Sequence, residues 1–316
     1  QLVDGQNSIE VFIKDKAGQT ATTVLQRTLD QTTPVIVVEQ PASSSFQNST
    51  DLTISGTLVE DNLESLTIGN APVEVTSGTF TTTVVLAPGS NSIDIIARDL
   101  ANNETIVTLE ATLDQTAPTI ALVSPNPEGF TNSIRPVIKL DYADSLAGIN
   151  QSSFAVSING AVKTGDFSVS DSSASYQPLE EEPLEDGLYV IEANVADNAT
   201  NNVTTSTHFF VDTVEPEVTF APANGVTIDD NTPLLTITYT DVGAGICPCS
   251  VRITLDGEDV TSSFNVDAGQ ATWQIDDAAP LAEGTHDLEI FVSDKAHNGV
   301  TKNSTFTIET GPPVPT

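Results

Sequence analysis

The chain has very little positive charge. Its 316 residues include 10 Lys and Arg against 44 Asp and Glu, which gives a formal net charge of −34 at pH 7. Charged residues make up 17% of the chain, below the roughly 25% of ordinary soluble domains, so the imbalance comes more from missing bases than from surplus acids. A protein that binds nucleic acid or docks on anionic lipid needs a basic face. The composition therefore excludes nucleic acid as a partner and argues against docking on a charged membrane.

The sequence also lacks long apolar runs, methionine and a cysteine framework. No apolar stretch approaches the roughly 18 residues of a membrane span, so direct membrane insertion is not expected. No Met is present and the chain starts at Gln1, which predicts a processed product or an excised piece. Cys247 and Cys249 are two positions apart and tie no distant segments together. A local disulfide, two free thiols, and an intermolecular link or metal contact are all open for this pair.

A pattern that recurs four times is the main feature that the sequence contains. Each copy has an Asp in a short turn after an alternating apolar run, then an acid 15 residues later, then a Pro four residues after that. Such fixed spacing indicates tandem repeats of one structural unit. The turn residues are Asp15, Asp99, Asp197 and Asp294, the later acids are Asp30, Asp114, Asp212 and Glu309, and the prolines are Pro34, Pro118, Pro216 and Pro313.

Short β-branched runs bounded by Gly, Pro, Asn and Asp fill each repeat, as in 35–38, 52–55 and 234–239. Long helical periodicity is absent. Strands spaced by about 8–12 residues in units of this length predict a sandwich of about seven strands. We therefore expect an all-β fold of tandem immunoglobulin-like β-sandwiches arranged end to end. The cysteine and tryptophan signature of antibody domains is missing, and Trp273, the one tryptophan, is expected in a core.

The repeat sets the expected domain boundaries. Residues 1–32 contain only the last two strands of a unit, so they are expected to be the C-terminal hairpin of a preceding or incomplete repeat. A lone hairpin is marginal in water. Either the chain is a piece of a longer array, or a neighbouring chain completes this half-domain. Three immunoglobulin-like domains are then expected at 33–116, 117–214 and 215–312, followed by a tail or linker at 313–316.

The motifs resemble those of bacterial immunoglobulin-like (Big-type) tandem repeats, which occur in large cell-surface adhesins and extracellular fibres. The resemblance rests on the Asp-x-Ala-x-Asn turn, on Leu-Asp-Gln-Thr-x-Pro at 29–34 and 113–118, and on the run from Gly245 to Gly257. It covers essentially the whole chain and is specific for the domain type rather than for one protein. It implies an extracellular, cell-surface location and a non-catalytic role.

Acidic residues converge at each expected junction between repeats. In a sandwich of this type the B–C and F–G loops lie at the pole where the preceding domain ends. Clustered carboxylates repel one another unless a cation neutralises them, and ligands that are all oxygen favour a hard ion such as Ca²⁺. We therefore expect interdomain calcium. The candidate ligands are Asp30, Glu60, Asp61 and Asp99 at the first junction, Asp114, Asp141, Asp144 and Asp197 at the second, and Asp212, Asp241 and Asp294 at the third.

A simpler interpretation of these acids must be set beside the calcium sites. Asp and Asn are common in turns because their side chains bond to their own backbone and tolerate left-handed conformations. One Asp-containing turn would be explained in this way, but fixed spacing at three junctions favours a cation. No spacing supports a Ser-His-Asp or Cys-His catalytic arrangement, and no phosphate loop is present. An enzyme is not expected.

The expected function is that of a structural and adhesive protein, a stalk or extender of tandem domains made rigid by calcium. One alternative is a subunit of a surface filament that is completed by strand exchange at 1–32. Another is a carbohydrate-binding accessory module of a secreted enzyme. The expected partners are other copies or repeats of the same protein, together with cell-surface or glycan ligands.

Overall fold

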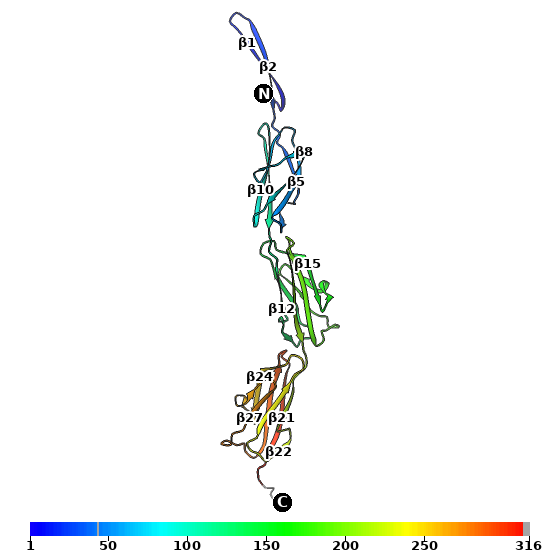
Figure 1. Cartoon of the computed structure of the whole chain (residues 1–316), viewed down its shortest axis with the longest axis vertical. Helices are drawn as coiled ribbons and strands as arrows, with labels where there is room; N and C mark the ends of the chain where they lie inside the picture. Colours follow the sequence, from blue (N-terminus) through cyan, green and yellow to red (C-terminus); the bar gives the residue numbers. More distant parts are fainter. Residues whose placement is uncertain (43, 312–316) are drawn as a thin grey trace. The chain divides into compact units, whose positions relative to one another are not determined.

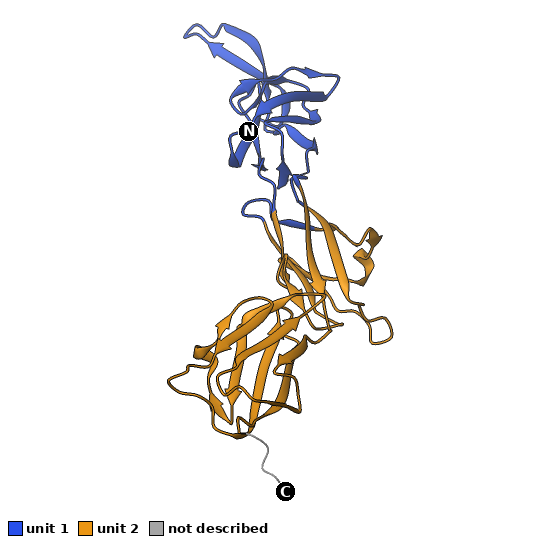
Figure 2. Ribbon diagram, turned by 60° about the horizontal axis from the view of Figure 1, so that its bottom comes forward, with its two compact units in different colours: residues 1–118, 144–150, 196–202 blue, residues 119–143, 151–195, 203–316 orange. Residues whose placement is uncertain are grey.

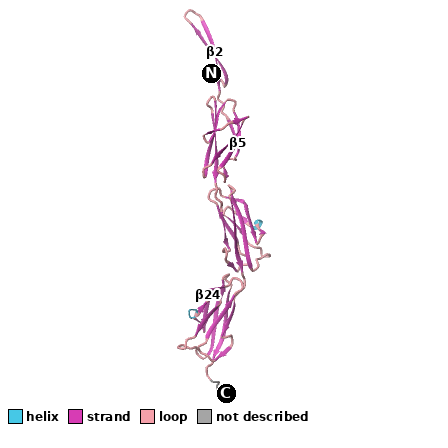
Figure 3. Ribbon diagram, viewed as in Figure 1, coloured by secondary structure: helices cyan, strands magenta, loops and turns pink. Residues whose placement is uncertain are grey.

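The computed structural model describes residues 1–42 and 44–311, which are almost entirely strands and turns (Figures 1 and 3). The helical elements in this part of the chain are two single turns of 3₁₀ helix, η1 (Thr164–Asp166) and η2 (Thr261–Ser263). The all-β prediction is confirmed. Within the described residues, no helix has the length and apolar character to cross a membrane. The expected tail at 313–316, with Pro313 and residue 312, lies outside the described residues.

The chain divides into two compact units, coloured separately in Figure 2. The first contains residues 1–118 together with the loops 144–150 and 196–202. The second contains residues 119–143, 151–195 and 203–311 of the described chain. Two loops that belong by sequence to the second sandwich are therefore part of the first unit.

The N-terminal element is a two-stranded hairpin of β1 (Gly5–Lys14) and β2 (Thr20–Leu29). The antiparallel register runs from Gly5 opposite Leu29 to Lys14 opposite Thr20. In the described structure these two strands form a sheet with no third member. Apolar side chains on it stay exposed, with Phe12 at 59% and Ile13 at 63%.

The first sandwich packs a five-stranded sheet against a four-stranded one. The five-stranded sheet has the order β4-β11-β10-β6-β7 and the other the order β3-β5-β9-β8. The strands are β3 (Val35–Gln40), β4 (Ser45–Gln47), β5 (Asp51–Val59), β6 (Leu63–Ile68), β7 (Ala71–Pro72), β8 (Val75–Thr76), β9 (Thr79–Val85), β10 (Gly89–Asp99) and β11 (Glu104–Leu113).

The second sandwich repeats this arrangement, with sheets in the orders β13-β20-β19-β15-β16 and β12-β14-β18-β17. Its strands are β12 (Thr119–Ser124), β13 (Phe130–Thr131), β14 (Ile138–Ala143), β15 (Ile149–Ile158), β16 (Ala161–Val162), β17 (Ser168–Val169), β18 (Ser173–Tyr176), β19 (Gly187–Asp197) and β20 (Asn202–Val211).

The third sandwich has sheets in the orders β22-β29-β28-β24-β25 and β21-β23-β27-β26. Its strands are β21 (Glu217–Ala221), β22 (Val226–Ile228), β23 (Leu234–Thr240), β24 (Ile246–Leu255), β25 (Glu258–Asp259), β26 (Asn265–Val266), β27 (Gln270–Gln274), β28 (Gly284–Asp294) and β29 (Gly299–Ile308). The recurrence of one strand order in three sandwiches confirms the prediction of tandem immunoglobulin-like domains.

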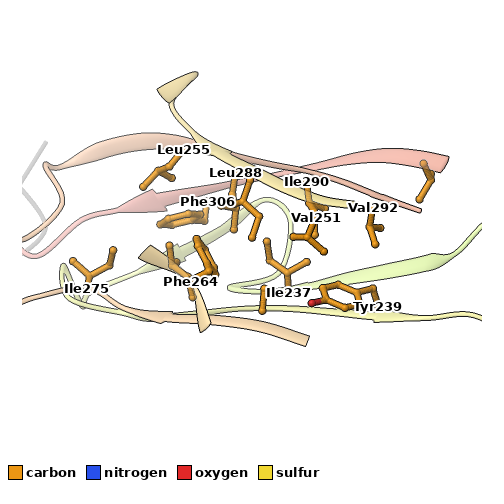
Figure 4. Packing of buried hydrophobic residues seen from close by; sticks show 14 of the residues in the cluster. Ile237, Tyr239, Val251, Leu255, Phe264, Ile275, Leu288, Ile290, Val292 and Phe306 are labelled. Carbon is orange, nitrogen blue, oxygen red and sulfur yellow. The ribbon is translucent and has the colours of Figure 1, made fainter. Parts of the chain in front are cut away.

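The period-2 pattern of the strands builds each core. In β5 every second residue from Leu52 to Leu58 is buried, since alternate side chains point to opposite faces of a strand. In the third sandwich, side chains from both sheets meet between the layers, including Ile237, Ile290 and Phe306 (Figure 4). Trp273 packs against this core and is partly buried, as the sequence predicts.

The two cysteines form a local disulfide at the start of β24. It lies within a register shift of the β24–β28 pairing that extends from Cys247 to Arg252. Of the three states open from the sequence, the structure has the intramolecular bond.

Candidate metal centres

Nine carboxylates lie in three clusters, and each cluster has the same make-up. In each, one oxygen from each of three residues lies within 4.8 Å of the other two. One residue follows the last strand of a repeat. One belongs to the loop after β5, β14 or β23, which we call the B–C loop. One ends the penultimate strand β10, β19 or β28 at its turn, which we call the F–G turn. We name them the first cluster (Asp30, Glu60, Asp99), the second cluster (Asp114, Asp144, Asp197) and the third cluster (Asp212, Asp241, Asp294).

The F–G aspartate of each cluster is fixed by its own turn. The Oδ1 atom of Asp99 accepts hydrogen bonds from the backbone N–H groups of Ala101 and Asn103, both at 2.8 Å. The same oxygen accepts from Asn201 in the case of Asp197 and from Asn298 in the case of Asp294. This is the local turn chemistry of aspartate. The simpler interpretation of the Asp-containing turns is therefore correct for one carboxylate oxygen.

The asparagine of each F–G turn joins that aspartate to the preceding linker. The side-chain amide of Asn201 donates from Nδ2 to Asp197 Oδ2 at 2.7 Å and to the backbone carbonyl of Asp114 at 2.8 Å. Asn103 and Asn298 make the same pair of bonds. An asparagine amide oxygen can itself bind Ca²⁺. The structure instead uses the amide nitrogen atoms of these asparagines to hold the carboxylates in place.

In the third cluster the B–C loop acid is held by one oxygen, which leaves the other free for a ligand. Asp241 Oδ1 accepts from the N–H groups of Gly243 at 3.1 Å and Gly245 at 2.7 Å. Its Oδ2 atom is buried and has no hydrogen-bond partner. A buried carboxylate oxygen without a partner is costly, and a bound cation would satisfy it.

The linker acid of the second and third clusters contacts the B–C loop of the following sandwich. Asp114 accepts from Thr116 through Oδ1, and from the N–H of Ala147 at 2.9 Å through Oδ2. Asp212 likewise accepts from Val214 through Oδ1 and from Ala244 through Oδ2. Asp114, Asp197, Asp212 and Asp294 are all buried, with at most 3% of each residue exposed.

The pKa values of these acids shift in different directions. Burial raises the pKa of Asp99, but hydrogen bonds from Asn103 and Ala101 outweigh it, so the pKa lies below its usual value. The pKa of Asp114 is lowered in the same way, since bonds from Thr116 and Ala147 outweigh burial. The pKa of Asp294 is raised, chiefly by burial and also by the neighbouring carboxylates of Asp212 and Asp241. In the third cluster the neighbouring carboxylates thus add to the effect of burial on the pKa of Asp294.

The donor set fits a hard divalent cation. All the converging atoms are carboxylate oxygens, which Ca²⁺ prefers, and no His or Cys joins them. The ion pairs of the described chain involve other carboxylates, so no Lys or Arg neutralises a cluster through a salt bridge there. Calcium takes six to eight oxygens, so backbone carbonyls and water would complete the shell.

Two of the acids expected at the junctions lie outside the clusters. Asp141 belongs to strand β14, opposite Ala121, and its carboxylate pairs with Lys139 Nζ at 2.7 Å. Asp61 lies in the B–C loop beside the ligand position of Glu60. It lines a cavity of about 360 Å³ that also contains Asp4, Asp30 and Glu60. Asp141 lies within strand β14, whereas Asp144 lies in the loop after the strand ends at Ala143 and enters the cluster.

The carboxylates directly before the penultimate strands were not among the residues predicted from the sequence. Asp4, Asp186 and Glu283 each precede the glycine that begins such a strand and bond to the residue after a last-strand acid. The signal was available, because an acid followed by Gly recurs in the repeats at 4–5, 186–187 and 283–284. It was obscured because the first complete repeat has Pro88 at that place.

Comparison with known families gives one match to part of the chain. Residues 34–115 match the family of glucodextranase, domain B. The chain is also 30% identical over 105 residues to bacillopeptidase F of Bacillus subtilis (strain 168). That segment is 33% of this chain and 7% of the relative, so the chain corresponds to a small part of that protein.

Similar solved structures include repeats of bacterial adhesins. A tetra-tandem repeat from the extending region of a large adhesion protein is 19% identical, and the match covers 98% of this chain and 83% of that one at a TM-score of 0.35. A Ca²⁺-stabilised adhesin with which an Antarctic bacterium binds ice is 18% identical, covering 96% and 81% at a TM-score of 0.28. The immunoglobulin-like repeat type that the sequence predicts is displayed by the paired sheets of each sandwich.

Proposed function

We propose that the chain is a non-catalytic structural segment of an extracellular, cell-surface protein, a stalk whose sandwiches are locked together by calcium. The observation that carries the proposal is the recurrence of one three-carboxylate cluster at three places. Each cluster takes one acid from the end of a last strand and two from loops of the following sandwich. Chance acidic turns would not reproduce this composition three times.

Calcium would act here as a crosslink. An ion bound by the third cluster would join Asp212, in the linker, to Asp241 and Asp294 in the sandwich that follows. The linker from Asp212 to Pro216 is too short to bend freely once its first residue is fixed. Without the ion, repulsion among the three carboxylates would favour separation. Calcium would thereby restrict the angle between consecutive sandwiches.

The disulfide supports an extracellular location. Bonds of this kind form and persist in oxidising compartments and are rare in the cytosol. Extracellular calcium modules bind with dissociation constants of about 10⁻⁴ to 10⁻³ M, which suits the millimolar calcium outside cells. The proposed location and the proposed cation are therefore consistent with each other.

Small-angle X-ray scattering with and without calcium tests the stalk. We expect the maximum dimension to be large and sharply defined in 2 mM calcium, and the distance distribution to broaden after excess chelator is added, because the linkers then bend. The strand content should stay constant by circular dichroism. Superimposable scattering curves would contradict the proposal that calcium sets the interdomain angle.

The N-terminal hairpin favours a second candidate function, completion by further strands. Val11 and Ile13 occupy the repeat positions of Ile95 and Ala97, yet they are 39% and 63% exposed where the latter two are fully buried. The hairpin therefore has the apolar face that the last two strands of a repeat normally bury, but no second sheet covers it in the described structure. Either an earlier part of the same repeat or a neighbouring chain in a filament would cover it. Concentration-dependent sedimentation that is lost on deleting residues 1–32 would support the filament, and a monomer at all concentrations would exclude it.

The carbohydrate-binding alternative has less support in the described structure. A sugar-binding face usually presents grouped aromatic rings. The large aromatic side chains that are well exposed in the described residues are Phe12, Phe46 and Phe291, which belong to the hairpin, the first sandwich and the third sandwich. No two of them belong to the same sheet.

A further inference from the structure

The carboxylates that directly precede three penultimate strands form a second repeated arrangement. Asp4 Oδ1 accepts from the N–H of Gln31 at 3.0 Å. Asp186 accepts from Thr213 twice, with Oδ1 at 3.0 Å from the N–H and Oδ2 at 3.2 Å from the hydroxyl. Glu283 accepts from the N–H and the hydroxyl of Thr310. We call these three contacts the linker ties.

The linker ties extend the ladder between the last two strands of a repeat. In the third sandwich the ladder ends with Gly284 opposite Ile308, and in the hairpin it ends with Gly5 opposite Leu29. Past this point the penultimate strand offers no further carbonyl to the N–H groups of the linker. A carboxylate just before the glycine supplies the missing acceptor, so the second linker residue is held as if it were still in the sheet.

The position of the tie matters because the neighbouring residue is a candidate metal ligand. The tied residues Gln31 and Thr213 directly follow Asp30 and Asp212, which belong to the first and third clusters. The N–H of Asp212 donates to the carbonyl of Thr131 at 3.0 Å. With Thr213 tied to Asp186, the peptide groups on both sides of the ligand are fixed, so its carboxylate is aimed before an ion arrives.

We infer that Asp186 is a positioning residue for the third cluster, and that Asp4 has the same role for the first. Neither is among the three residues whose oxygens converge. Each acts by holding the residue after the linker ligand. The inference rests on the proposed calcium function, and it adds a residue that sets the affinity of a site without being one of its ligands.

The second cluster provides an internal contrast. At the place of Asp186 the first sandwich has Pro88, whose side chain has no acceptor. Asp114 is instead oriented by Thr116 and Ala147, and the side chain of Gln115 donates to the carbonyl of Asn48 at 3.2 Å. The second cluster should therefore be indifferent to every variant of the linker ties.

Two substitutions at one position separate positioning from charge. Asp186→Ala removes the tie, and Asp186→Asn removes the charge but keeps an oxygen that accepts from the N–H of Thr213. Outer-shell partners of metal sites typically change affinity 10- to 100-fold. We expect Asp186→Ala to weaken calcium binding at the third cluster about tenfold and Asp186→Asn to stay within about twofold of the original chain.

Backbone amide resonances followed during a calcium titration of the full chain report each cluster separately. Ala244 reports the third cluster and Ala147 the second, because their N–H groups donate to Asp212 and Asp114. Glu283→Ala is the matched control, since it removes a tie in the same sandwich whose partner is Thr310. It should leave both titrations unchanged. Equal weakening by Asp186→Asn and Asp186→Ala would show that only charge matters and would overturn the inference.

Hydrogen exchange measured in chelator tests the bond between Asp186 and Thr213 separately from calcium binding. Without calcium, the Thr213 N–H should be protected in the original chain and in Asp186→Asn, and should exchange at least tenfold faster in Asp186→Ala. If the original chain shows no calcium response at Ala244 while this exchange pattern holds, the proposed function fails and the tie remains as a linker contact. If calcium binds and Asp186→Ala binds it as tightly as the original chain, the positioning role fails.

Discussion

At the scale of single residues, the two oxygens of a clustered carboxylate have different contacts. In Asp99 and Asp241 one oxygen accepts backbone N–H groups of its own loop, and this bond fixes the direction of the other oxygen. The turn chemistry and the metal interpretation are therefore compatible, because the first prepares the second. A single sequence pattern could not separate them, since both need Asp at the same position.

Loss of one ligand from the third cluster should lower the stability of the chain in calcium but should not lower it in chelator. Asp241→Asn removes a charge from a repelling group, so the chain without calcium should become equally or more stable. In calcium at 100 times the dissociation constant, the variant should lose the stabilisation of about 2.7 kcal/mol that such binding supplies. Thermal unfolding with calcium and with chelator measures both effects. Asp141→Asn is the control, because Asp141 lies outside the clusters and should leave the calcium response intact.

His286 gives the third sandwich a pH-dependent contact away from the clusters. Nδ1 lies 2.7 Å from Asp256 Oδ2 and Nε2 lies 2.8 Å from the carbonyl of Ala282, and neither partner can donate. The ring makes both bonds only when doubly protonated. Burial lowers the pKa of His286, but the bonds to Ala282 and Asp256 outweigh it, and the pKa is raised above 6.5.

Because the pKa of His286 is higher in the folded chain than in the unfolded chain, the stability that its two bonds contribute is complete below the ordinary histidine pKa of about 6.5. It is lost as the pH rises through the folded value. Urea unfolding in chelator should therefore show lower stability at pH 8.5 than at pH 6 in the original chain. His286→Gln should remove most of that difference. An unchanged pH dependence in the variant would contradict the assignment.

At the scale of the elements, the alternation of apolar residues predicted the strands because each strand buries one face. It could not predict where local hydrogen bonds extend a ladder, since Asp4 and Asp186 lie just before the strands, outside the apolar alternation. Ligand positions in loops were predicted from the repeat spacing. Asp141, also expected as a ligand, lies on strand β14 and outside the carboxylates that converge.

A close contact between strands in the first sandwich should make one glycine irreplaceable. A Cβ atom on Gly56 would lie 2.1 Å from the carbonyl oxygen of Val37 and 2.7 Å from the ring of Phe80. The backbone oxygen cannot move without breaking the β3–β5 pairing. We expect Gly56→Ala to destabilise the first sandwich by about 3 kcal/mol. Unfolding by denaturant measures the change. Gly165→Ala should be nearly neutral in this measurement, because no atom would lie within 4 Å of the added Cβ.

At the scale of the whole molecule, the clusters account for part of the net charge. Three bound divalent ions would remove six of the 34 net negative charges. Electrophoretic mobility corrected for molecular size should therefore fall in magnitude when calcium is added. A variant that combines Asp99→Asn, Asp197→Asn and Asp294→Asn should show a smaller change than the original chain. An equal change in both would mean that calcium acts by general screening.

The way the clusters divide between repeats has a consequence for how such a chain can lengthen. The first and second sandwiches each carry two acids of one cluster at their start and one acid of the next cluster at their end. A duplicated or deleted repeat therefore adds or removes one whole cluster, and the neighbours on either side need no matching change. The length of such a chain can therefore vary through the number of repeats alone.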